Sequence, residues 1–382
     1  MRIAVDARTM GYRPSGIGIY LYDFLCELVK KKDFQITLLT DVAESPQIQT
    51  LIESGIRVRC FGKRVFRSLG VYPYFSFVRE YLCKEQPDLF WEPNNLLPVK
   101  LNGFKGKTVL TVHDLFPITK PEYFHWSYRI YFRLGIMRSL NFADAVLFNS
   151  METKNQTMST FPKAGEKSTL VSYLIVKKPP VREVKDDGFF LYIGNLERRK
   201  GTDLLLAAYR RYCQMNGGRA LYLGGSIREK EIEVQLAECQ KECSGLRYLG
   251  YLQEAEKYDY LASCRCFLFP SKAEGFGLPP LEAMGYGKRV LTSDLGIFRE
   301  ILGNQNVTFS LRVPKEEQIE ELSRLMLKED RIFGRNRDGN LDKAFTMKSE
   351  KQRLERYNEE TLGELLAGFL KGVAGDKNES RV

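Results

Sequence analysis

Short apolar runs alternate with amphipathic stretches along most of the 382 residues of the chain. The first run, at residues 2–6, contains Ile and Val, ends abruptly at a polar residue and predicts a buried strand. A loop rich in Gly, Pro and Ser follows at residues 11–18, and apolar side chains then recur at helical spacing over residues 20–32. Short strands that alternate with helices are typical of a parallel, doubly wound sheet.

The same alternation continues in two blocks, which a stretch rich in Lys, Pro and Val separates at residues 176–187. In the first block the pattern predicts strands at residues 35–39, 56–61, 89–91, 108–112 and 145–148. In the second block it predicts strands at residues 189–193, 219–223, 247–249, 266–269 and 290–292, and helices at residues 201–213 and 229–243. From residue 316 the chain is expected to be helical and charged, with a frayed tail at 375–382. The chain is therefore expected to form two α/β domains.

Composition narrows the class of protein without identifying it. Hydrophobic residues make up 43% and charged residues 28% of the chain, which is ordinary for a globular protein and excludes wholesale disorder. We find no run of about 18 apolar residues and no secretory signal, so no membrane span is expected. None of the eight cysteines has a histidine nearby. Free thiols in a reducing cytoplasm are therefore expected, rather than a zinc or redox site.

The positive charge of the chain lies almost entirely in its first half. Lys and Arg total 58 against 48 Asp and Glu, a formal net charge of +10. Residues 1–180 hold 25 basic and 16 acidic side chains, whereas residues 181–382 hold 33 and 32. The first half is thus expected to meet an anionic partner, either a phosphorylated substrate or acidic lipid headgroups, unless the charge is only a solvated basic surface. Nucleic acid is not expected, because no recognition module is visible.

The stretch that carries most chemical information lies at residues 269–284. A strand is expected to end there, and Pro279 and Pro280 then stand where a helix would begin. A helix start at the carboxyl end of a parallel strand presents free N–H groups and a positive dipole end, which suit a diphosphate. Two carboxylates, Glu274 and Glu282, bracket the turn. Carboxylates accept hydrogen bonds from hydroxyl groups, so they suit a sugar beside that diphosphate.

This stretch, Glu-Gly-Phe-Gly-Leu-Pro-Pro-Leu-Glu-Ala-Met from Glu274, resembles the signature of the retaining glycosyltransferases of family four, the group 1 glycosyl transferases. Four further segments agree with that family in order and spacing: residues 15–20, 111–117, 148–150 and 194–201. The resemblance runs from residue 1 to about residue 310. It implies the GT-B fold, an α/β architecture in which two Rossmann-like domains with doubly wound parallel sheets face a cleft.

The resemblance also implies a division of labour between the domains. Residues 1–178 would form an N-terminal, acceptor-binding Rossmann-like domain. Residues 188–345 would form a C-terminal, nucleotide-sugar-binding Rossmann-like domain. Residues 346–372 would form a C-terminal helix that crosses back to the N-terminal domain.

Roles for particular residues follow from the resemblance. Arg199 and Lys200 match a basic pair that neutralises the leaving diphosphate, and fixed cations suit the charge that develops there. Without such a ligand, two cations at a helix start would oppose its dipole. Glu282 is implied to hold the ribose hydroxyls, Glu274 to contact the donor sugar, and Gly16 to allow close approach of the backbone to the donor phosphates.

His113 follows a predicted strand and is implied to contact the donor sugar, not to act as a general base. The remaining donor-binding residues implied by the resemblance are Gly194, Phe276, Gly277 and Leu278. The chain contains no Asp-x-Asp motif, so no metal is expected at the site. No cofactor is expected either, since a nucleoside-diphosphate sugar is the co-substrate.

Two positions depart from the family pattern. Asn195 stands where many relatives have a second arginine, so diphosphate binding would depend more on Arg199 and Lys200. Near the end of the second domain, Phe298-Arg-Glu-Ile replaces a turn that often carries Pro-Glu, and Glu300 is only a structural or nucleotide-side candidate. Neither departure touches the two motif glutamates.

The implied activity is retaining transfer of a hexose from a nucleoside-diphosphate sugar, with a slight lean to GDP-mannose, to a glycan or lipid-linked acceptor in cell-surface polysaccharide synthesis. A GT-B epimerase, a phosphorylase and a non-catalytic binding protein of the same fold remain as alternatives. A nicotinamide dehydrogenase does not fit, because the third glycine of its phosphate-binding loop would fall at Leu21.

Two segments of the first half mix basic and apolar residues. Residues 57–77 could lie on an anionic membrane, at the inner face of the cell membrane, or bind a lipid-diphosphate acceptor. The alternative is an ordinary strand and helix with exposed arginines. A second group is predicted to pack in the core: Tyr128, Arg129, Tyr131, Arg133 and Arg138.

Overall fold

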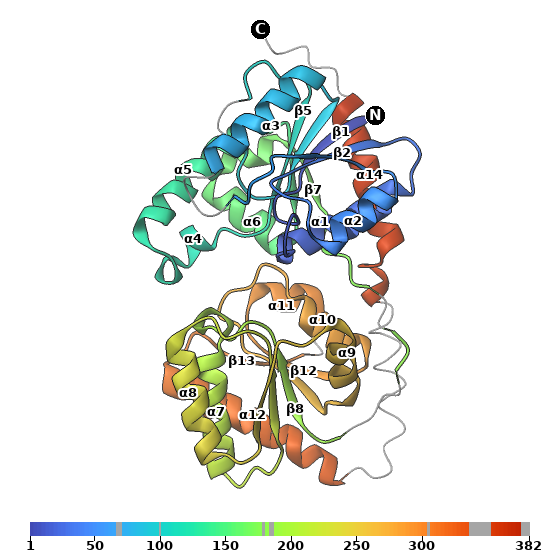
Figure 1. Ribbon diagram of the computed structural model, residues 1–382. Coiled ribbons are helices and arrows are strands. Elements are labelled where there is room, and N and C mark those ends of the chain that lie inside the picture. Colours follow the sequence, from blue (N-terminus) through green and yellow to red (C-terminus); the bar gives the residue numbers. More distant parts are fainter. Residues whose placement is uncertain are drawn as a thin grey trace. The chain divides into compact units, whose positions relative to one another are not determined.

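The computed structural model describes residues 1–65, 71–98, 101–177, 180–182, 187–303, 306–335 and 353–375. The chain divides into two compact units, the first made of Met1–Ile175 with Tyr357–Val382 and the second of Val176–Arg356 (Figure 1). The predicted boundary at 345/346 and the tail beyond residue 375 lie outside the described residues.

The first unit contains a seven-stranded sheet in which each strand pairs in parallel with its neighbours, in the order β3-β2-β1-β4-β5-β6-β7. Its strands are β1 (Arg2–Asp6), β2 (Gln35–Thr40), β3 (Arg57–Cys60), β4 (Leu89–Glu92), β5 (Lys107–Val112), β6 (Ala145–Phe148) and β7 (Ser168–Val171). The strand order reverses between β1 and β4. At such a switch point, open α/β sheets form their ligand sites outside the carboxyl ends of the strands.

Helices cover both faces of this sheet. They are α1 (Gly16–Val29), α2 (Pro46–Glu53), α3 (Val71–Glu85), α4 (Phe116–Thr119), α5 (Trp126–Phe142), α6 (Met151–Thr160) and α14 (Glu359–Gly375). Because side chains alternate along a strand, Ile3 and Val5 enter one apolar cluster and Ala4 enters the other. The C-terminal helix α14 packs against α1 and adds Leu362, Leu366 and Leu370 to the first of these clusters, beside the N-terminal strands (Figure 1).

The second unit contains a six-stranded sheet, again with parallel neighbours, in the order β10-β9-β8-β11-β12-β13. Its strands are β8 (Phe190–Ile193), β9 (Leu221–Gly224), β10 (Leu246–Gly250), β11 (Cys266–Phe269), β12 (Arg289–Ser293) and β13 (Val307–Phe309). Its helices are α7 (Thr202–Gln214), α8 (Lys230–Glu242), α9 (Glu254–Ser263), α10 (Leu278–Gly285), α11 (Gly296–Leu302) and α12 (Lys315–Arg335). A short 3-10 helix, Arg198–Lys200, precedes α7.

Three local expectations were wrong. The first helix begins at Gly16 rather than residue 20, because the Ser15 side chain accepts a hydrogen bond from the Gly18 N–H and caps it there. The sequence pattern missed β7 and β13, which are only four and three residues long. Such short edge strands are only partly buried and lack a clear apolar signature.

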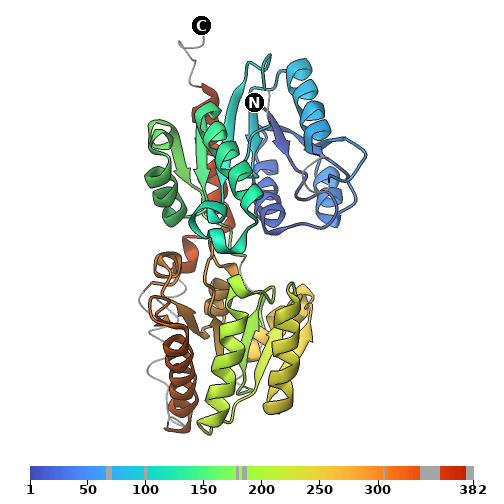
Figure 2. The same cartoon turned by 90° about the vertical axis from the view of Figure 1, so that its left-hand side faces the viewer.

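The predicted core packing of the α5 group was also wrong. Tyr128, Arg129, Tyr131 and Arg133 are exposed, and Arg138 is half-buried. The buried side of α5 is formed instead by Phe132, Ile136, Ser139 and Leu140. α5 lies on the outside of the first unit and faces the viewer in Figure 2.

The stretch at residues 57–77 forms β3 and the start of α3, and residues 66–70 lie outside the description. Tyr74 and Phe75 of α3 are buried. Within the described ranges, no helix combines the length and the hydropathy needed to cross a bilayer.

Candidate functional site

Two cations predicted to bind diphosphate, Arg199 and Lys200, lie on the turn that follows β8. Gly201 ends this turn with a φ of 71°, and a Cβ atom there would collide with the carbonyl oxygen of Pro270. Glycine therefore allows the turn to lie directly against the loop after β11. Since β8 and β11 are neighbours in the sheet, the cations lie at the carboxyl edge of two adjacent strands.

Lys200 forms an ion pair with Glu274, which lies on the loop after β11. Only 15% of the Lys200 side chain and 13% of the Glu274 side chain are accessible to solvent. The Ser271 hydroxyl lies 3.4 Å from the same carboxylate oxygen, Oε2. The structure thus fixes one oxygen of Glu274, while Oε1 accepts no hydrogen bond from the described residues.

Arg199 is held against the same loop. Its Nη1 donates to the Ala273 carbonyl at 3.1 Å, and its Nη2 lies 2.5 Å from a carboxylate oxygen of Glu197. Its own backbone carbonyl accepts a hydrogen bond from the Lys272 N–H at 2.9 Å. The contacts with Ala273 and Lys272 therefore place Arg199 beside the loop that carries Glu274.

The start of α10 contributes backbone donors to this edge. Gly277 has a φ of 103°, and a Cβ atom there would lie 3.0 Å from the Phe298 ring, so glycine suits both the backbone and the space. Proline lacks an N–H, so residues 279 and 280 offer no donor to an anion. The amides of Gly277 and Leu278 are therefore the donors that this helix start presents. The Phe276 side chain is buried.

Glu282, predicted to hold the ribose, lies inside α10 and pairs with Lys257 of α9 at 2.6 Å. The sequence did not single out Lys257. A lysine in a charged helix carries no local signal, since its partner comes from another segment of the chain. The pair leaves one oxygen of Glu282 for a second hydrogen bond.

Of the predicted second-unit residues, the structure brings Arg199, Lys200 and Glu274 onto two touching loops. Gly194 lies directly after β8, where its N–H donates to the Gly224 carbonyl at 2.9 Å. Glu282 forms its own pair a short way along α10, and no contact joins it directly to Glu274 in the described structure.

His113 belongs to the first unit and follows β5. Its Nε2 lies 2.8 Å from the Pro93 carbonyl, and a carbonyl only accepts, so Nε2 carries the proton. Burial lowers the pKa of His113 to about 4. The ring is therefore neutral at pH 7, and its Nδ1 keeps a lone pair that can accept a hydrogen bond.

Gly16 begins α1, and a Cβ atom at this position would meet no atom within 4 Å. The space over the helix start is therefore open. Gly16 and His113 are connected through Tyr20 of α1, whose ring meets the His113 ring edge-on at a centroid distance of 4.9 Å.

A buried ionic cluster at the ends of β1 and β4 was not predicted. Arg8 pairs with Asp6, and its Nη2 lies 3.6 Å from Oε1 of Glu92. The Tyr74 hydroxyl donates to Asp6 at 2.8 Å, and the Phe75 ring lies 4.9 Å from the guanidinium carbon. The sequence position of the carboxylates could have indicated this cluster, because Asp6 and Glu92 each come directly after a short apolar run.

Glu92 carries the unusual chemistry of this cluster. Its Oε1 accepts hydrogen bonds from the backbone and side-chain amides of Asn94, at 3.0 and 2.8 Å. Its buried Oε2 has no hydrogen-bond partner among the described residues. Burial and the neighbouring Asp6 carboxylate raise the pKa of Glu92 well above its usual value. For Arg8, burial opposes the charge, but Asp6 and Glu92 outweigh that effect and raise its pKa.

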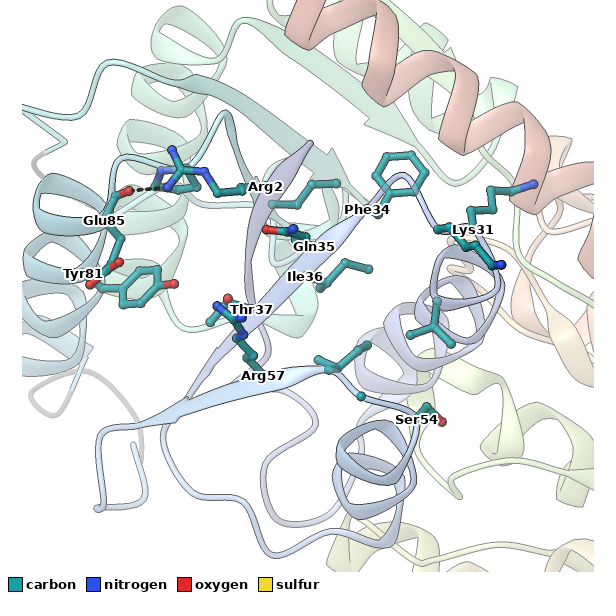
Figure 3. Close-up of a pocket in the computed structure, with 16 residues that line it drawn as sticks. Arg2, Lys31, Phe34, Gln35, Ile36, Thr37, Ser54, Arg57, Tyr81 and Glu85 are labelled. Atoms are coloured by element: carbon teal, nitrogen blue, oxygen red, sulfur yellow. Dashed lines mark hydrogen bonds between the residues drawn. The ribbon is translucent and has the colours of Figure 1, made fainter.

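The first unit also has a hollow of about 300 Å³ at the opposite edge of its sheet, shown in Figure 3. Its walls include Arg2, Lys31 and Arg57, and Arg2 donates to the Glu85 carbonyl. These residues lie at the amino ends of β1 and β3 or beyond the end of α1. Ligand sites of parallel sheets form at the carboxyl ends, so the hollow is separate from the candidate site.

The chain matches two family models that together cover most of its length. Residues 176–345 match glycosyl transferases group 1, and residues 14–172 match glycosyltransferase family 4. The chain belongs to the group 1 glycosyltransferases of the family 4 type. This glycosyltransferase is 27% identical over 329 residues to the O-antigen chain mannosyltransferase B of Escherichia coli, covering 80% of this chain and 85% of that relative.

A second relative and a solved structure extend the comparison. The serotype-specific mannosyltransferase WbdA of Escherichia coli is 25% identical over 244 residues, or 58% of this chain, and the glycosyltransferase matches only 29% of that longer protein. The crystal structure of Anabaena HepE in complex with UDP and glucose superposes with a TM-score of 0.70 at 21% identity, covering 97% of this chain and 99% of that one. The fold is GT-B, as predicted.

Proposed function

We propose that this glycosyltransferase moves a hexose from a nucleoside-diphosphate sugar to a glycan or lipid-linked acceptor during cell-surface polysaccharide synthesis. The observation that carries the proposal is the placement of Arg199, Lys200 and Glu274 on two touching loops at the carboxyl edge of the second sheet. The similarity to an O-antigen chain mannosyltransferase supports the class of product.

Arg199 and Lys200 stabilise the leaving group. When the bond between the anomeric carbon and the β-phosphate oxygen breaks, its electron pair stays on the nucleoside diphosphate. Two fixed cations beside that oxygen lower the energy of the developing charge, and mutation of one such contact in enzymes typically costs about 10²–10³-fold in turnover. The Gly277 and Leu278 amides add donors to the same diphosphate.

The motif glutamates hold the neutral parts of the donor. Glu274 Oε1 accepts a hydrogen bond from a hydroxyl of the sugar, while Oε2 keeps Lys200 in position. Glu282 accepts a hydrogen bond from the ribose, while Lys257 holds its other oxygen. Each carboxylate thus positions a lysine with one oxygen and accepts a hydrogen bond from a hydroxyl of the donor with the other.

The reaction is a displacement with retention of configuration, as the resemblance to family four implies. The acceptor hydroxyl approaches the anomeric carbon from the face on which the diphosphate departs. A carbon–oxygen bond forms to the acceptor as the bond to phosphate breaks, and the hydroxyl proton passes to the leaving phosphate oxygen. His113 is neutral and offers Nδ1 as an acceptor to a donor-sugar hydroxyl, so it positions the sugar and removes no proton.

The reaction needs no metal and no cofactor under this proposal, because protein cations carry the charge of the diphosphate. GDP-mannose is the preferred donor, since the relatives in E. coli are mannosyltransferases. UDP-glucose is the competing donor, because HepE, which has a similar fold, is seen in complex with UDP and glucose. The acceptor binds the basic first unit, at the inner face of the cell membrane.

A transfer assay with GDP-mannose and UDP-glucose, offered with short synthetic glycans in free and lipid-linked form, tests this function. We expect release of one nucleoside diphosphate per glycan extended, undiminished by a chelator, and an anomeric NMR signal of the product with the configuration of the donor. Inverted configuration would contradict retention. A phosphate-dependent reaction would identify a phosphorylase, and isomerisation of the sugar nucleotide without an acceptor would identify an epimerase.

A further inference from the structure

The buried ionic cluster of Asp6, Arg8 and Glu92 belongs to the first unit, whereas the residues proposed to bind the diphosphate belong to the second. The two carboxylate side chains are fully buried, and 15% of the Arg8 side chain is accessible to solvent. Taking charges out of water is costly, and apolar residues of similar volume are often at least as stable in such places. Buried charge clusters therefore concentrate at functional sites, and this one lies where the strand order of the first sheet reverses.

Arg8 is held in place on three sides but still has hydrogen-bond donors to offer. Its Nη1 pairs with Asp6, and its guanidinium carbon lies 5.6 Å from the ring centre of Tyr74 and 4.9 Å from that of Phe75. Its Nε and Nη2 donate no hydrogen bond to the residues that the structure describes. Because the side chain reaches solvent, these two nitrogens can donate to a ligand.

Two exposed tyrosines lie near this guanidinium. Tyr72 is in the first turn of α3 and Tyr131 is in the first half of α5, and their exposed fractions are 55% and 46%. Both helices connect parallel strands and so begin near the carboxyl edge, and their buried residues join one apolar cluster on one face of the sheet. Burial and the Tyr72 hydroxyl raise the pKa of Tyr131, whereas the charge of Arg8 lowers it. The Tyr131 hydroxyl is therefore close to both groups.

The loop after β4 adds hydrogen-bond acceptors and connects the cluster to His113. Oε2 of Glu92 and Oδ1 of Asn94 are buried and have no hydrogen-bond partner among the described residues. Buried acceptors are normally satisfied by an ordered water or a ligand. The same loop holds His113, whose backbone N–H donates to Asn95 Oδ1 at 2.7 Å and whose Nε2 donates to the Pro93 carbonyl. A ligand at the cluster would therefore lie near the residue proposed to contact the donor sugar.

We propose that Arg8, Tyr72 and Tyr131 bind a neutral sugar of the acceptor glycan. This inference rests on the proposed function, in which the first unit receives the acceptor. The guanidinium donates hydrogen bonds to hydroxyl oxygens of the sugar, and the tyrosine rings contact its apolar C–H face. Glu92 and Asn94 accept hydrogen bonds from the sugar through a bridging water. These residues hold the acceptor in place and take no part in bond making or breaking.

The charge of the cluster favours a neutral sugar over one that carries a phosphate or carboxylate group. Asp6 balances the charge of Arg8, so the cluster is neutral when Glu92 is protonated and negative when Glu92 is ionised. In neither state does it offer an excess of positive charge to an anion. Its combination of donors, acceptors and exposed aromatic rings instead matches an uncharged ligand with many hydroxyl groups.

Simple sugars offered to the full chain test this assignment. We expect saturation-transfer NMR to detect binding of a neutral methyl glycoside of mannose, glucose or galactose. The signal should weaken in Tyr131→Ala and in Arg8→Lys, because each variant loses a proposed contact with the sugar. Binding of mannose 6-phosphate and methyl glucuronide alone would identify an anionic ligand and overturn the proposal. No binding of any neutral glycoside, or binding that neither substitution weakens, would overturn it as well.

Steady-state kinetics with the glycan that is extended in the transfer assay separates acceptor binding from a structural effect. Arg8→Lys keeps a positive charge beside Asp6 but loses the planar set of donors. It should raise the acceptor KM by about tenfold, the loss of one charged hydrogen bond, and leave the donor KM unchanged. Tyr131→Ala removes an exposed side chain and should raise the acceptor KM by about fivefold. An unchanged acceptor KM in both variants, or an equal rise in the donor KM, would contradict the assignment.

Phe142→Ala is the matched control for Tyr131→Ala. Phe142 is 63% exposed and ends α5, and this end of the helix lies toward the amino edge of the sheet because α5 leads into β6. Its substitution should leave the acceptor KM unchanged, and a rise equal to that of Tyr131→Ala would contradict the proposal. Thermal shifts with GDP and UDP report on the second unit alone. The acceptor site and the proposed donor site can therefore fail independently.

Discussion

One ion pair, between Lys200 and Glu274, lies at the carboxyl edge of the second sheet and leaves one oxygen of the glutamate without a partner among the described residues. Glu274 holds the Lys200 ammonium through one carboxylate oxygen. Under the proposed function, Lys200 then lies beside the diphosphate and the second oxygen of Glu274 accepts a hydrogen bond from a sugar hydroxyl. Arg198, the residue just before this basic pair, forms a more exposed ion pair with Glu229. Adjacent cations of one turn are therefore directed to different partners, which allows a matched comparison.

Lys200→Ala should lower turnover by about 10²-fold or more, because one fixed charge beside the leaving group is lost. Arg198→Ala removes a cation of the same turn that pairs away from the site, and should leave turnover within a few-fold of the parent. Both variants are assayed for release of nucleoside diphosphate at saturating donor. Near-normal turnover of Lys200→Ala would remove Lys200 from the proposed role.

His113 makes stability depend on pH. Its pKa is about 4 in the folded chain against 6.5 when unperturbed, so between these values the unfolded chain binds the proton preferentially. The free energy of unfolding is therefore highest above pH 6.5, where the ring is neutral in both states. It falls as the pH drops towards 4, by about 3 kcal/mol in total. In urea titrations across this range, His113→Gln should flatten the pH dependence of the unfolding free energy. Parallel curves for the two proteins would contradict the buried neutral ring.

At the residue level, the motifs predicted that Arg199, Lys200 and Glu274 lie at one edge of the sheet. Each follows a predicted strand, and residues that follow parallel strands lie at the same, carboxyl edge of the sheet. The motifs could not predict Lys257 or the partners of Glu92, since those contacts join segments far apart in the chain. The roles of the motif residues remain predictions for the experiments described here.

At the scale of elements, the first turn of α7 depends on contact with the loop after β11. Gly201 combines a left-handed backbone with a position where a Cβ atom would collide with the Pro270 carbonyl. The two loops that carry Lys200 and Glu274 can therefore approach only if this residue is glycine.

Gly201→Ala should destabilise the protein by about 1–3 kcal/mol, from backbone strain and displacement of the Pro270 loop. Gly218→Ala is the control, because a Cβ atom there meets nothing within 4 Å and its φ is not in the left-handed region. Urea unfolding measures both. Equal effects of the two substitutions would show that the close approach is unimportant.

Helix α5 illustrates a limit of sequence patterns. Apolar residues at helical spacing indicate a helix, but they do not say which of its sides faces the core, and the predicted core packing of Tyr128 and Tyr131 was wrong. The structure assigns Phe132 and Ile136 to the interior and leaves Trp126 and Leu134 outside. Tertiary packing decides between two sides that the sequence makes nearly equivalent.

At the scale of the molecule, the chain returns to its starting unit at its end. α14 packs against α1 and completes an apolar cluster with β1 and β4. The two α/β blocks were predictable, because strand and helix patterns repeat on either side of residues 176–187. The local pattern does not identify the packing partner of α14, since amphipathic helices fit many surfaces. Only the resemblance to the family implied a C-terminal helix, at residues 346–372, that crosses back to the N-terminal domain.

Leu366→Ala should cost about 2–5 kcal/mol of stability in the first unit, because it leaves a cavity under α14. Its neighbour Leu365 is 44% exposed, so Leu365→Ala should change stability little. Thermal unfolding followed by tryptophan fluorescence reports on the first unit, because both tryptophans of the chain, Trp91 and Trp126, lie in it. A similar loss for both substitutions would contradict the packing of α14 on α1.

The central claim is that the second unit binds a nucleoside-diphosphate sugar through the two touching loops and α10. A thermal-shift panel of nucleoside diphosphates and their sugars tests it most directly, because a ligand at 100 times its dissociation constant adds about 2.7 kcal/mol of stability. We predict a shift with one nucleotide class, GDP before UDP, that Glu282→Ala abolishes and the exposed control Glu231→Ala retains. No shift with any nucleotide, or a shift unaffected by Glu282→Ala, would contradict the proposed donor site.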